Sequence, residues 1–233
     1  MPYRRLPNTD TARIKALKTA IEKSSNTDFR EMAISANVLS AAKIALNNFE
    51  RLYNSHKITF NSQVNGNKSF HHKVKNCRMY LSHFIQVLYF CVIRSEVKKE
   101  QLELYDLQDY NLLIPELTTN EQLLEWGEKI VGGENLRIAN GGVPIYNPSI
   151  AKVNVMYSIF REGYETQQQF QKSTNEALEE LSKYRDVVDE AIFNIWEEVE
   201  HANFDLPTEE RIKKNIEYGI VYYYRKGEVS LWL

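Results

Sequence analysis

Apolar residues recur with helical spacing over several long stretches of this chain, and this periodicity restricts the fold to long amphipathic helices. The clearest run lies near the C-terminal end and comprises Leu178, Leu181, Val188, Ile192, Ile195, Val199 and Ala202. The 233 residues include only 9 Gly and 6 Pro, which favours long helices over many turns. The sequence therefore predicts a predominantly all-α fold.

Two helical hairpins are expected from the breaks in this periodicity. The first covers 35–96 and is interrupted by the sequence NGNKS at 65–69. The second covers 147–203 and is interrupted by the polar sequence QQQFQKSTN at 167–175. A single hairpin leaves an apolar face bare, so the two are expected to pack together as a four-helix bundle within one domain, 1–233.

The two hairpins align as a weak internal repeat. A shift of 107 residues places Arg78 on Arg185, Leu81 on Val188 and Ile85 on Ile192. Arg78 and Arg185 each lie beside an apolar stripe, and two interpretations stay open. Each guanidinium extends to the edge of the bundle, or each pairs with a carboxylate on a facing helix and fixes the register of the hairpins.

The segment 132–149, GGENLRIANGGVPIYNPS, carries four of the nine glycines and two prolines. This composition predicts an ordered connection or a flexible linker. One of the short extra helices is expected just before it, capped by Asn120. It lacks the Gly-Lys-Ser/Thr sequence of a phosphate-binding loop. Arg137 and Asn140 are candidates for contacting a ligand or a partner from this loop.

The C-terminal segment 219–233 has two β-prone runs around Lys226-Gly227 and predicts a small β-hairpin. A lone two-stranded hairpin is marginally stable in water, so it must cover something. One arrangement packs it on the bundle, with PYRRL at 2–6 as a third strand. The other pairs its edge with a second copy of the chain.

The charge is distributed unevenly along the sequence. Residues 1–95 carry 15 Lys+Arg against 5 Asp+Glu, and residues 96–233 carry 14 against 26. The basic residues are scattered along helices, which favours two halves that neutralise each other. The alternative is nucleic-acid binding by the basic half, with Tyr3 and Tyr80 available to stack on bases. Its basic residues would be Arg4, Arg5, Arg13, Lys15, Lys18, Lys73, Lys75 and Arg78.

No set of residues predicts a metal, a cofactor or a catalytic site. Glu198 and His201 form one Glu-x-x-His pair, but a di-iron bundle needs two such pairs, and the sequence has no second. His71, His72 and Cys77 have poor spacing for zinc. The expected role of Glu198 and His201 is therefore the solvated end of an acidic helix.

The sequence gives three indications of a reduced, cytoplasmic protein. Cys77 and Cys91 lie 14 residues apart in one helical pattern, which separates them by about 21 Å and precludes a disulfide. The apolar stretch at 81–93 is too short and too polar to span a bilayer. The first ten residues, MPYRRLPNTD, lack the apolar region of a secretory signal.

The chain resembles a family of uncharacterised bacterial proteins. The likeness is carried by YRRLPNTDTAR at the start, RMYLSHFIQVL at 78–88, and the longer segments 126–153 and 207–228. The resemblance implies a one-domain, mostly helical protein without an assigned activity. We expect such a protein to act as a scaffold or adaptor, binding a protein partner or a second copy of itself without catalysis.

Overall fold

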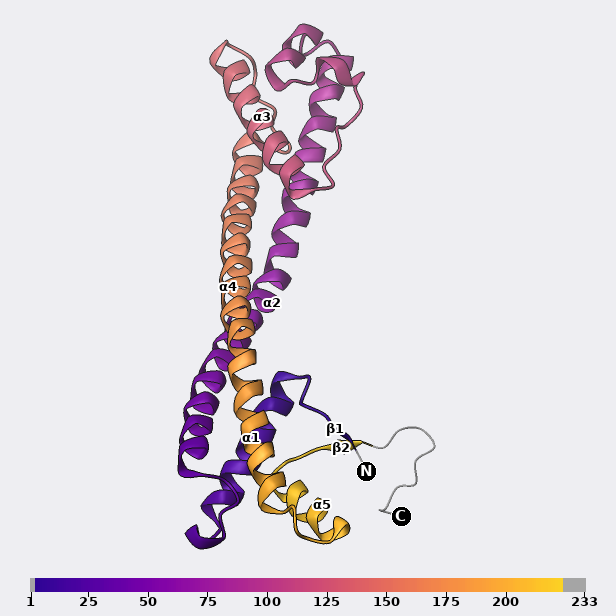
Figure 1. The fold of residues 1–233 in the computed structure, drawn as a ribbon. Helices are drawn as coiled ribbons and strands as arrows, with labels where there is room; N and C mark the ends of the chain where they lie inside the picture. Colours follow the sequence, from indigo (N-terminus) through magenta and orange to yellow (C-terminus); the bar gives the residue numbers. More distant parts are fainter. Residues whose placement is uncertain (1–2, 224–233) are drawn as a thin grey trace. The chain divides into compact units, whose positions relative to one another are not determined.

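A computed structural model describes residues 3–223 of the chain and is predominantly α-helical, as predicted (Figure 1). The α-helices of this part are α1 (Asp10–Ser25), α2 (Ala36–Ile93), α3 (Asn120–Ala139), α4 (Ile150–Ala202) and α5 (Thr208–Glu217). Short 3-10 helices follow α1 as η1 (Phe29–Glu31) and α2 as η2 (Lys99–Tyr105) and η3 (Gln108–Tyr110). Two short strands, β1 (Tyr3–Arg4) and β2 (Tyr222–Tyr223), form the small sheet.

The two predicted hairpins, 35–96 and 147–203, are wrong, because α2 and α4 are each one continuous helix. Gly66, the expected breaker, lies inside α2 where α4 comes close. A Cβ at Gly66 would stand 2.7 Å from the Phe170 ring, so the glycine permits close packing rather than a turn. Glycine within a helix costs about 0.5–1 kcal/mol, which this contact between helices offsets. The polar sequence at 167–175 continues α4, and Gln167 Nε2 donates to Asn67 Oδ1 at 2.7 Å.

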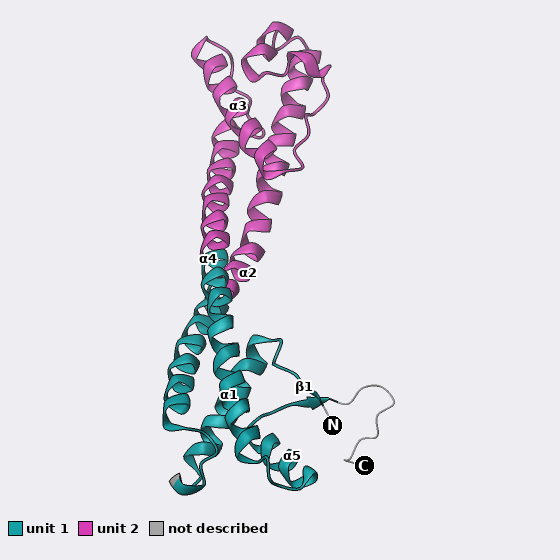
Figure 2. Ribbon diagram, in the orientation of Figure 1, with its two compact units in different colours: residues 1–59, 174–233 teal, residues 60–173 magenta. Residues whose placement is uncertain are grey.

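The chain divides into two compact units, coloured separately in Figure 2. Unit 1 comprises residues 1–59 and 174–233, and unit 2 comprises residues 60–173. Each of the long helices α2 and α4 contributes one part to unit 1 and the other part to unit 2. The internal repeat and the single domain over 1–233 stay predictions.

Unit 1 has its own apolar core between α1, the first part of α2 and the last part of α4. Leu17, Phe49, Val188 and Trp196 are fully buried in it. The parts of α2 and α4 run antiparallel within this unit, because Ser35 meets Glu198 and, further along α2, Asn48 meets Tyr184.

Unit 2 has a second core between the last part of α2, the first part of α4, α3 and η2. Phe70 stacks on Phe160 with ring centroids 5.9 Å apart, and Leu81 and Leu123 are fully buried. The helix α3 lies close to α4 at Gly127, where a Cβ would stand 2.2 Å from the Tyr157 ring.

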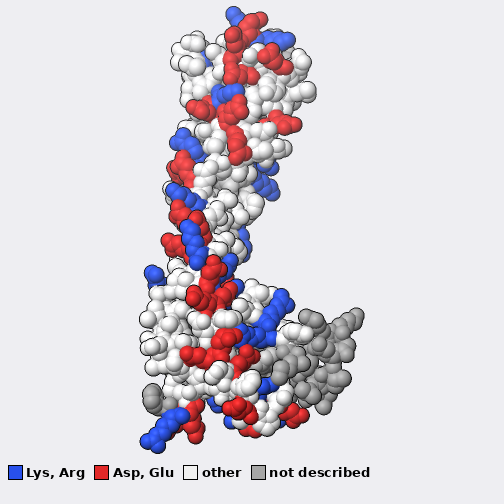
Figure 3. Space-filling model, viewed as in Figure 1, with Lys and Arg blue, Asp and Glu red and all other residues white. Residues whose placement is uncertain are grey.

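Opposite charges are combined within each unit, although they are separated along the sequence. Unit 1 holds 17 Lys+Arg and 19 Asp+Glu, and unit 2 holds 12 of each. Both signs are interspersed over the face in Figure 3. Each unit is therefore close to neutral, since it joins a part of basic α2 to acidic segments from later in the chain.

The small sheet joins the two ends of the described chain. Tyr3 pairs with Tyr223 and Arg4 with Tyr222 in antiparallel register, and Arg5 N donates to the Val221 carbonyl at 3.2 Å. The strand β1 thus lies beside β2, and this pairing is the part of the expected three-stranded arrangement that falls within the described residues. The rest of the predicted hairpin, from residue 224 onward, lies outside the described residues. Among the residues described, no helix offers an apolar stretch of the length needed to cross a membrane.

Candidate binding site

Arg137 lies in a buried ion pair, and its predicted place on an exposed glycine-rich loop is wrong. The helix α3 continues through Gly132 and Gly133 and ends at Ala139. Arg137 is 2% exposed and Glu134, one turn earlier, is 0% exposed. The loop is therefore shorter than predicted and begins at Asn140, which is exposed and caps α3 with its backbone N–H.

The pair is completed by Tyr105 from η2. Arg137 Nη2 donates to Glu134 Oε1 at 2.8 Å, and Arg137 Nε donates to Glu134 Oε2 at 2.9 Å. The Tyr105 hydroxyl donates to Glu134 Oε2 in a short hydrogen bond. Burial raises the pKa of Tyr105, and the bond to Glu134 raises it further, so the hydroxyl keeps its proton. Both oxygens of the buried carboxylate are satisfied, as a buried charge requires.

Two glycines make room for this cluster. A Cβ at Gly133 would stand 2.4 Å from the Leu104 carbonyl oxygen, so only glycine lets α3 approach η2 this closely. A Cβ at Gly142 would stand 2.7 Å from Arg137 Nη1. The glycines that suggested a flexible loop instead allow close packing around a charged pair.

The ion pair holds the loop 140–149 through two backbone hydrogen bonds. Arg137 Nη2 donates to the Val143 carbonyl at 2.8 Å, and the Ile145 N–H donates to Glu134 Oε1 at 3.2 Å. The side chains of Val143 and Tyr146 are 72% and 80% exposed, so the loop fixes two apolar groups in solvent.

A groove of about 480 Å³ lies between this loop and the end of α2, and we call it the loop groove. Its lining is largely apolar and comprises Val87, Cys91, Arg94, Glu96, Val97, Val143, Pro144, Ile145, Tyr146 and Asn147. The only charged side chains in that lining, Arg94 and Glu96, pair with each other at 3.0 Å. The groove is therefore suited to an apolar group.

The one thiol in the loop groove is a poor nucleophile. Burial raises the pKa of Cys91, which keeps the sulfur protonated at neutral pH. Arg94 Nη2 contacts the Cys91 sulfur at 3.7 Å, but burial has the larger effect on this pKa. The side chains of the groove favour binding over covalent chemistry.

Arg78 and Arg185 have different partners in the structure. Arg185 forms a two-bond ion pair with Asp10 of α1, with both N–O distances 2.8 Å. Arg78 instead donates to the backbone carbonyls of Leu117 and Thr118, at 2.6 and 2.9 Å, just before α3. The interpretation that Arg78 pairs with a carboxylate on a facing helix is therefore wrong, because its guanidinium donates to backbone carbonyls just before α3 instead. For Arg185 the carboxylate comes from α1.

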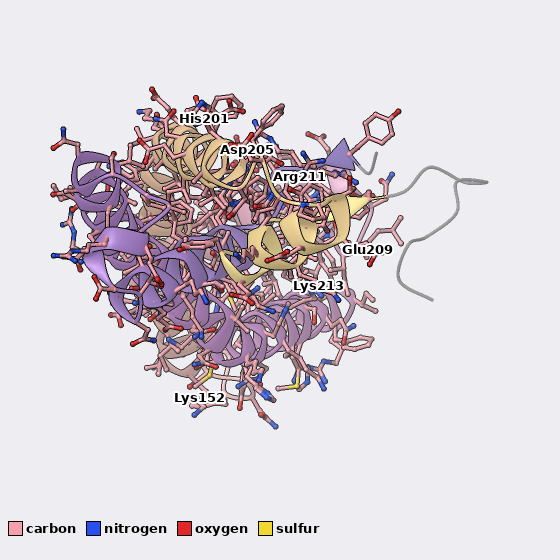
Figure 4. All side chains as sticks on the ribbon, turned by 60° about the horizontal axis from the view of Figure 1, so that its bottom comes forward. Lys152, His201, Asp205, Glu209, Arg211 and Lys213 are labelled. Atoms are coloured by element: carbon pink, nitrogen blue, oxygen red, sulfur yellow. The ribbon has the colours of Figure 1, made fainter. Side chains whose placement is uncertain are left out.

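Glu198 caps the N-terminus of α2. Its Oε2 accepts from the Ser35 N–H at 2.6 Å and its Oε1 accepts from the Ser35 hydroxyl at 2.8 Å. A carboxylate at this position stabilises the exposed N–H groups of a helix start. His201 is exposed in the last turn of α4 (Figure 4). Within residues 3–223 the structure places no three potential ligands together for a metal ion.

Several of the basic residues proposed above as a nucleic-acid-binding surface form ion pairs with carboxylates of the same chain. Arg4 pairs with Glu197 and Glu200, Arg13 pairs with Asp189, and Lys18 pairs with Glu50. Lys152 lies over the ring of Tyr80, with Nζ 5.9 Å from its centroid. These contacts reduce the positive potential that a phosphate backbone would meet.

No family model matches the chain, and no curated protein or solved structure is significantly similar to it. The resemblance to uncharacterised bacterial proteins therefore stays a prediction, and function has to be argued from the geometry.

Proposed function

We propose that the protein is a non-catalytic scaffold or adaptor that binds an apolar segment of a partner protein in the loop groove. The observation that carries the proposal is the loop 140–149, which a buried ion pair holds so that Val143 and Tyr146 stand exposed beside an apolar groove. Holding apolar side chains in solvent disfavours solubility and is typical of a binding surface.

The fixed backbone of the loop supports this proposal energetically. A binding loop that is ordered before the partner arrives loses less conformational entropy on association. Aromatic residues such as Tyr146 are enriched at the centres of protein interfaces. We place this activity in the cytoplasm, because Cys77 and Cys91 are both free and buried, as suits a reducing compartment.

Site-specific photo-crosslinking tests the proposal. A photoreactive phenylalanine analogue replaces Tyr146, and in a matched variant it replaces Leu113, which is 70% exposed in the same unit. The backbone carbonyl of Leu113 accepts a hydrogen bond from the Tyr89 hydroxyl. Tyr89 projects from the side of α2 opposite Val87 and Cys91, which line the loop groove, so Leu113 serves as a control away from the groove. The proposal expects one defined protein adduct from position 146 and none from position 113.

The identified partner is then purified and its affinity measured. Val143→Asp should weaken its binding by tenfold or more, as about 1–3 kcal/mol at a central interface residue implies. Leu113→Asp should leave the affinity unchanged. Adducts of equal yield from both positions, or an affinity insensitive to Val143→Asp, would exclude the loop groove as the binding site.

A further inference from the structure

We propose that a pocket beside α1 in unit 1 binds a small anionic amphiphile, a molecule with one carboxylate or phosphate group at the end of an apolar chain. We call it the α1 pocket. It has a volume of about 440 Å³ and is lined by residues from the segment 5–8, from α1 and from the segment 216–223. All of these belong to unit 1, whereas the loop groove belongs to unit 2. Pockets that take small molecules commonly measure roughly 300–1,000 Å³.

Two close contacts fix the walls of the α1 pocket. The Arg5 N–H donates to the Val221 carbonyl at 3.2 Å, which joins the N-terminal segment to the segment that leads into β2. Gly219 has a φ of +83°, and a Cβ there would stand 3.3 Å from the Ala16 carbonyl oxygen. Glycine adopts this positive φ without strain, so the chain can turn close against α1 at this point. The walls therefore belong to the fold, and ligand binding would require little ordering of the protein.

The floor of the α1 pocket is apolar. Ala16 and Ile220 line it and are almost fully buried. Leu6, Ile216 and Val221 line it too, but 37%, 46% and 44% of their surface stays exposed. An apolar chain in the pocket would cover these three side chains and withdraw its own surface from water, so the hydrophobic effect favours its binding.

Within the described part of the chain, two basic residues and no acidic residue line this pocket. The basic residues are Arg5 and Lys15, and both are exposed. The neighbouring Arg4 pairs with Glu200, but no carboxylate within residues 3–223 pairs with Arg5 or Lys15. The Arg5 guanidinium instead lies 5.9 Å from the centre of the Tyr223 ring. The pocket is therefore a site of local positive charge in a unit that holds more acidic than basic residues.

The cations and the apolar floor together indicate the class of ligand. An exposed cation stays hydrated, so it can pair with an anion at the mouth of the pocket without the cost of burying a charge. A guanidinium binds carboxylates and phosphates through two parallel hydrogen bonds. A purely polar anion would leave the apolar floor uncovered, and a purely apolar ligand would leave both cations without a counter-charge. A molecule with one anionic group and an apolar chain satisfies both parts of the site.

Calorimetric titration of the full chain with a matched series of ligands tests this proposal. Octanoate and octyl phosphate carry the two head groups, octan-1-ol has the same chain length without a charge, and acetate has a carboxylate without the chain. The proposal expects a dissociation constant of about 1 mM or lower for at least one of the two long-chain anions, and the tighter of them identifies the head group. Octan-1-ol and acetate should each bind at least about tenfold more weakly. High salt should weaken the binding of the anion, because both cations are exposed.

Variants of the chain locate the ligand. Lys15→Met keeps an apolar stem but removes a charge, and together with Arg5→Met it should weaken anion binding by about tenfold. Ala12→Phe fills the pocket from α1 and should abolish binding. Lys18→Met removes a charge from the same helix outside the lining and should leave the affinity unchanged.

Three results would overturn the proposal. The first is equal binding of octan-1-ol and the anions. The second is an affinity that neither Ala12→Phe nor the double variant alters, and the double variant keeps this test valid if Ala12→Phe disturbs the fold, because Arg5 and Lys15 are exposed. The third is the absence of any binding to the unmodified chain, which would point to an occupant from the chain itself or from a protein partner.

Discussion

The two units differ in how deeply their best-connected ion pair is buried. In unit 1 Arg185 of α4 pairs with Asp10 of α1, and their side chains are 32% and 17% exposed. In unit 2 the pair of Glu134 and Arg137 is removed from water, with side chains 0% and 2% exposed, while other pairs of that unit, such as Arg94 and Glu96, stay at the surface. Water-accessible pairs can be lost at small cost, whereas a buried pair is tolerated only while both members are present. The stability of unit 2 therefore depends on both members of its buried pair, and the same pair positions the loop groove.

The largest expected effect comes from breaking the buried pair. Arg137→Met leaves the Glu134 carboxylate buried without a counter-charge and should lower the free energy of unfolding by about 3–5 kcal/mol. Urea titration, with hydrogen exchange assigning the loss to unit 2, measures it. The double variant Glu134→Leu/Arg137→Met, which removes both charges, should be less destabilised than the single variant. A single variant as stable as the double would show that the pair does not act as a unit.

The next effect tests the close approach of α3 to η2. Gly133→Ala places a methyl group 2.4 Å from the Leu104 carbonyl and should destabilise unit 2 by about 1–3 kcal/mol. The neighbouring Gly132 has no atom within 4 Å of its Cβ position, so Gly132→Ala should stabilise the helix by about 0.5–1 kcal/mol. Thermal melting of both variants measures the difference. Equal shifts would mean that α3 does not lie this close to η2.

A smaller effect is expected in unit 1. Asp10→Asn removes the charge from the two-bond ion pair with Arg185 and should lower stability by about 0.5–1 kcal/mol. This loss should shrink in 1 M salt, because partly exposed charges are screened. If the free energy of unfolding fell by more than about 3 kcal/mol and the loss did not change with salt, the pair of Asp10 and Arg185 would behave as a buried pair, like Glu134 and Arg137.

The smallest effect appears only at alkaline pH. Burial raises the pKa of Cys77 from 9.0 to about 12. The thiol therefore ionises in the unfolded chain before it ionises in the folded one. Its contribution to stability is complete below pH 9 and falls as pH rises toward 12, with a loss of under about 1 kcal/mol at pH 9.5. Denaturation from pH 8 to 11 should show a shallower decline for Cys77→Ala, and identical slopes would contradict the assignment.

The helical class could be predicted because the apolar stripes of α2 and α4 are long and regular. Whether these helices are continuous or interrupted could not be predicted, because a glycine that ends a helix and a glycine that lets a neighbouring helix pack closely look alike in sequence. Gly66 is distinguished only by Phe170, which lies more than a hundred residues later.

The candidate binding site, too, could be predicted from the sequence only in part. Glu134 and Arg137 are three residues apart and opposite in charge, a spacing that permits an ion pair on a helix, but the segment was expected to be a loop and the pair was not predicted. Their burial depends on Tyr105 and on Gly133, whose proximity arises only in the folded unit. Arg137 was therefore identified as a candidate residue, but with an exposed position that the structure contradicts.

Hydrogen exchange at the Ile145 amide tests most directly whether the buried pair of Glu134 and Arg137 positions the loop groove. In the unmodified chain this amide should be protected, because it donates to Glu134 Oε1. In Glu134→Leu/Arg137→Met it should exchange at least about tenfold faster, as loss of about 1.4 kcal/mol of local stability implies, while amides of Val188 and Ile192 in unit 1 keep their rates. Unchanged protection of Ile145 in the double variant would contradict the account.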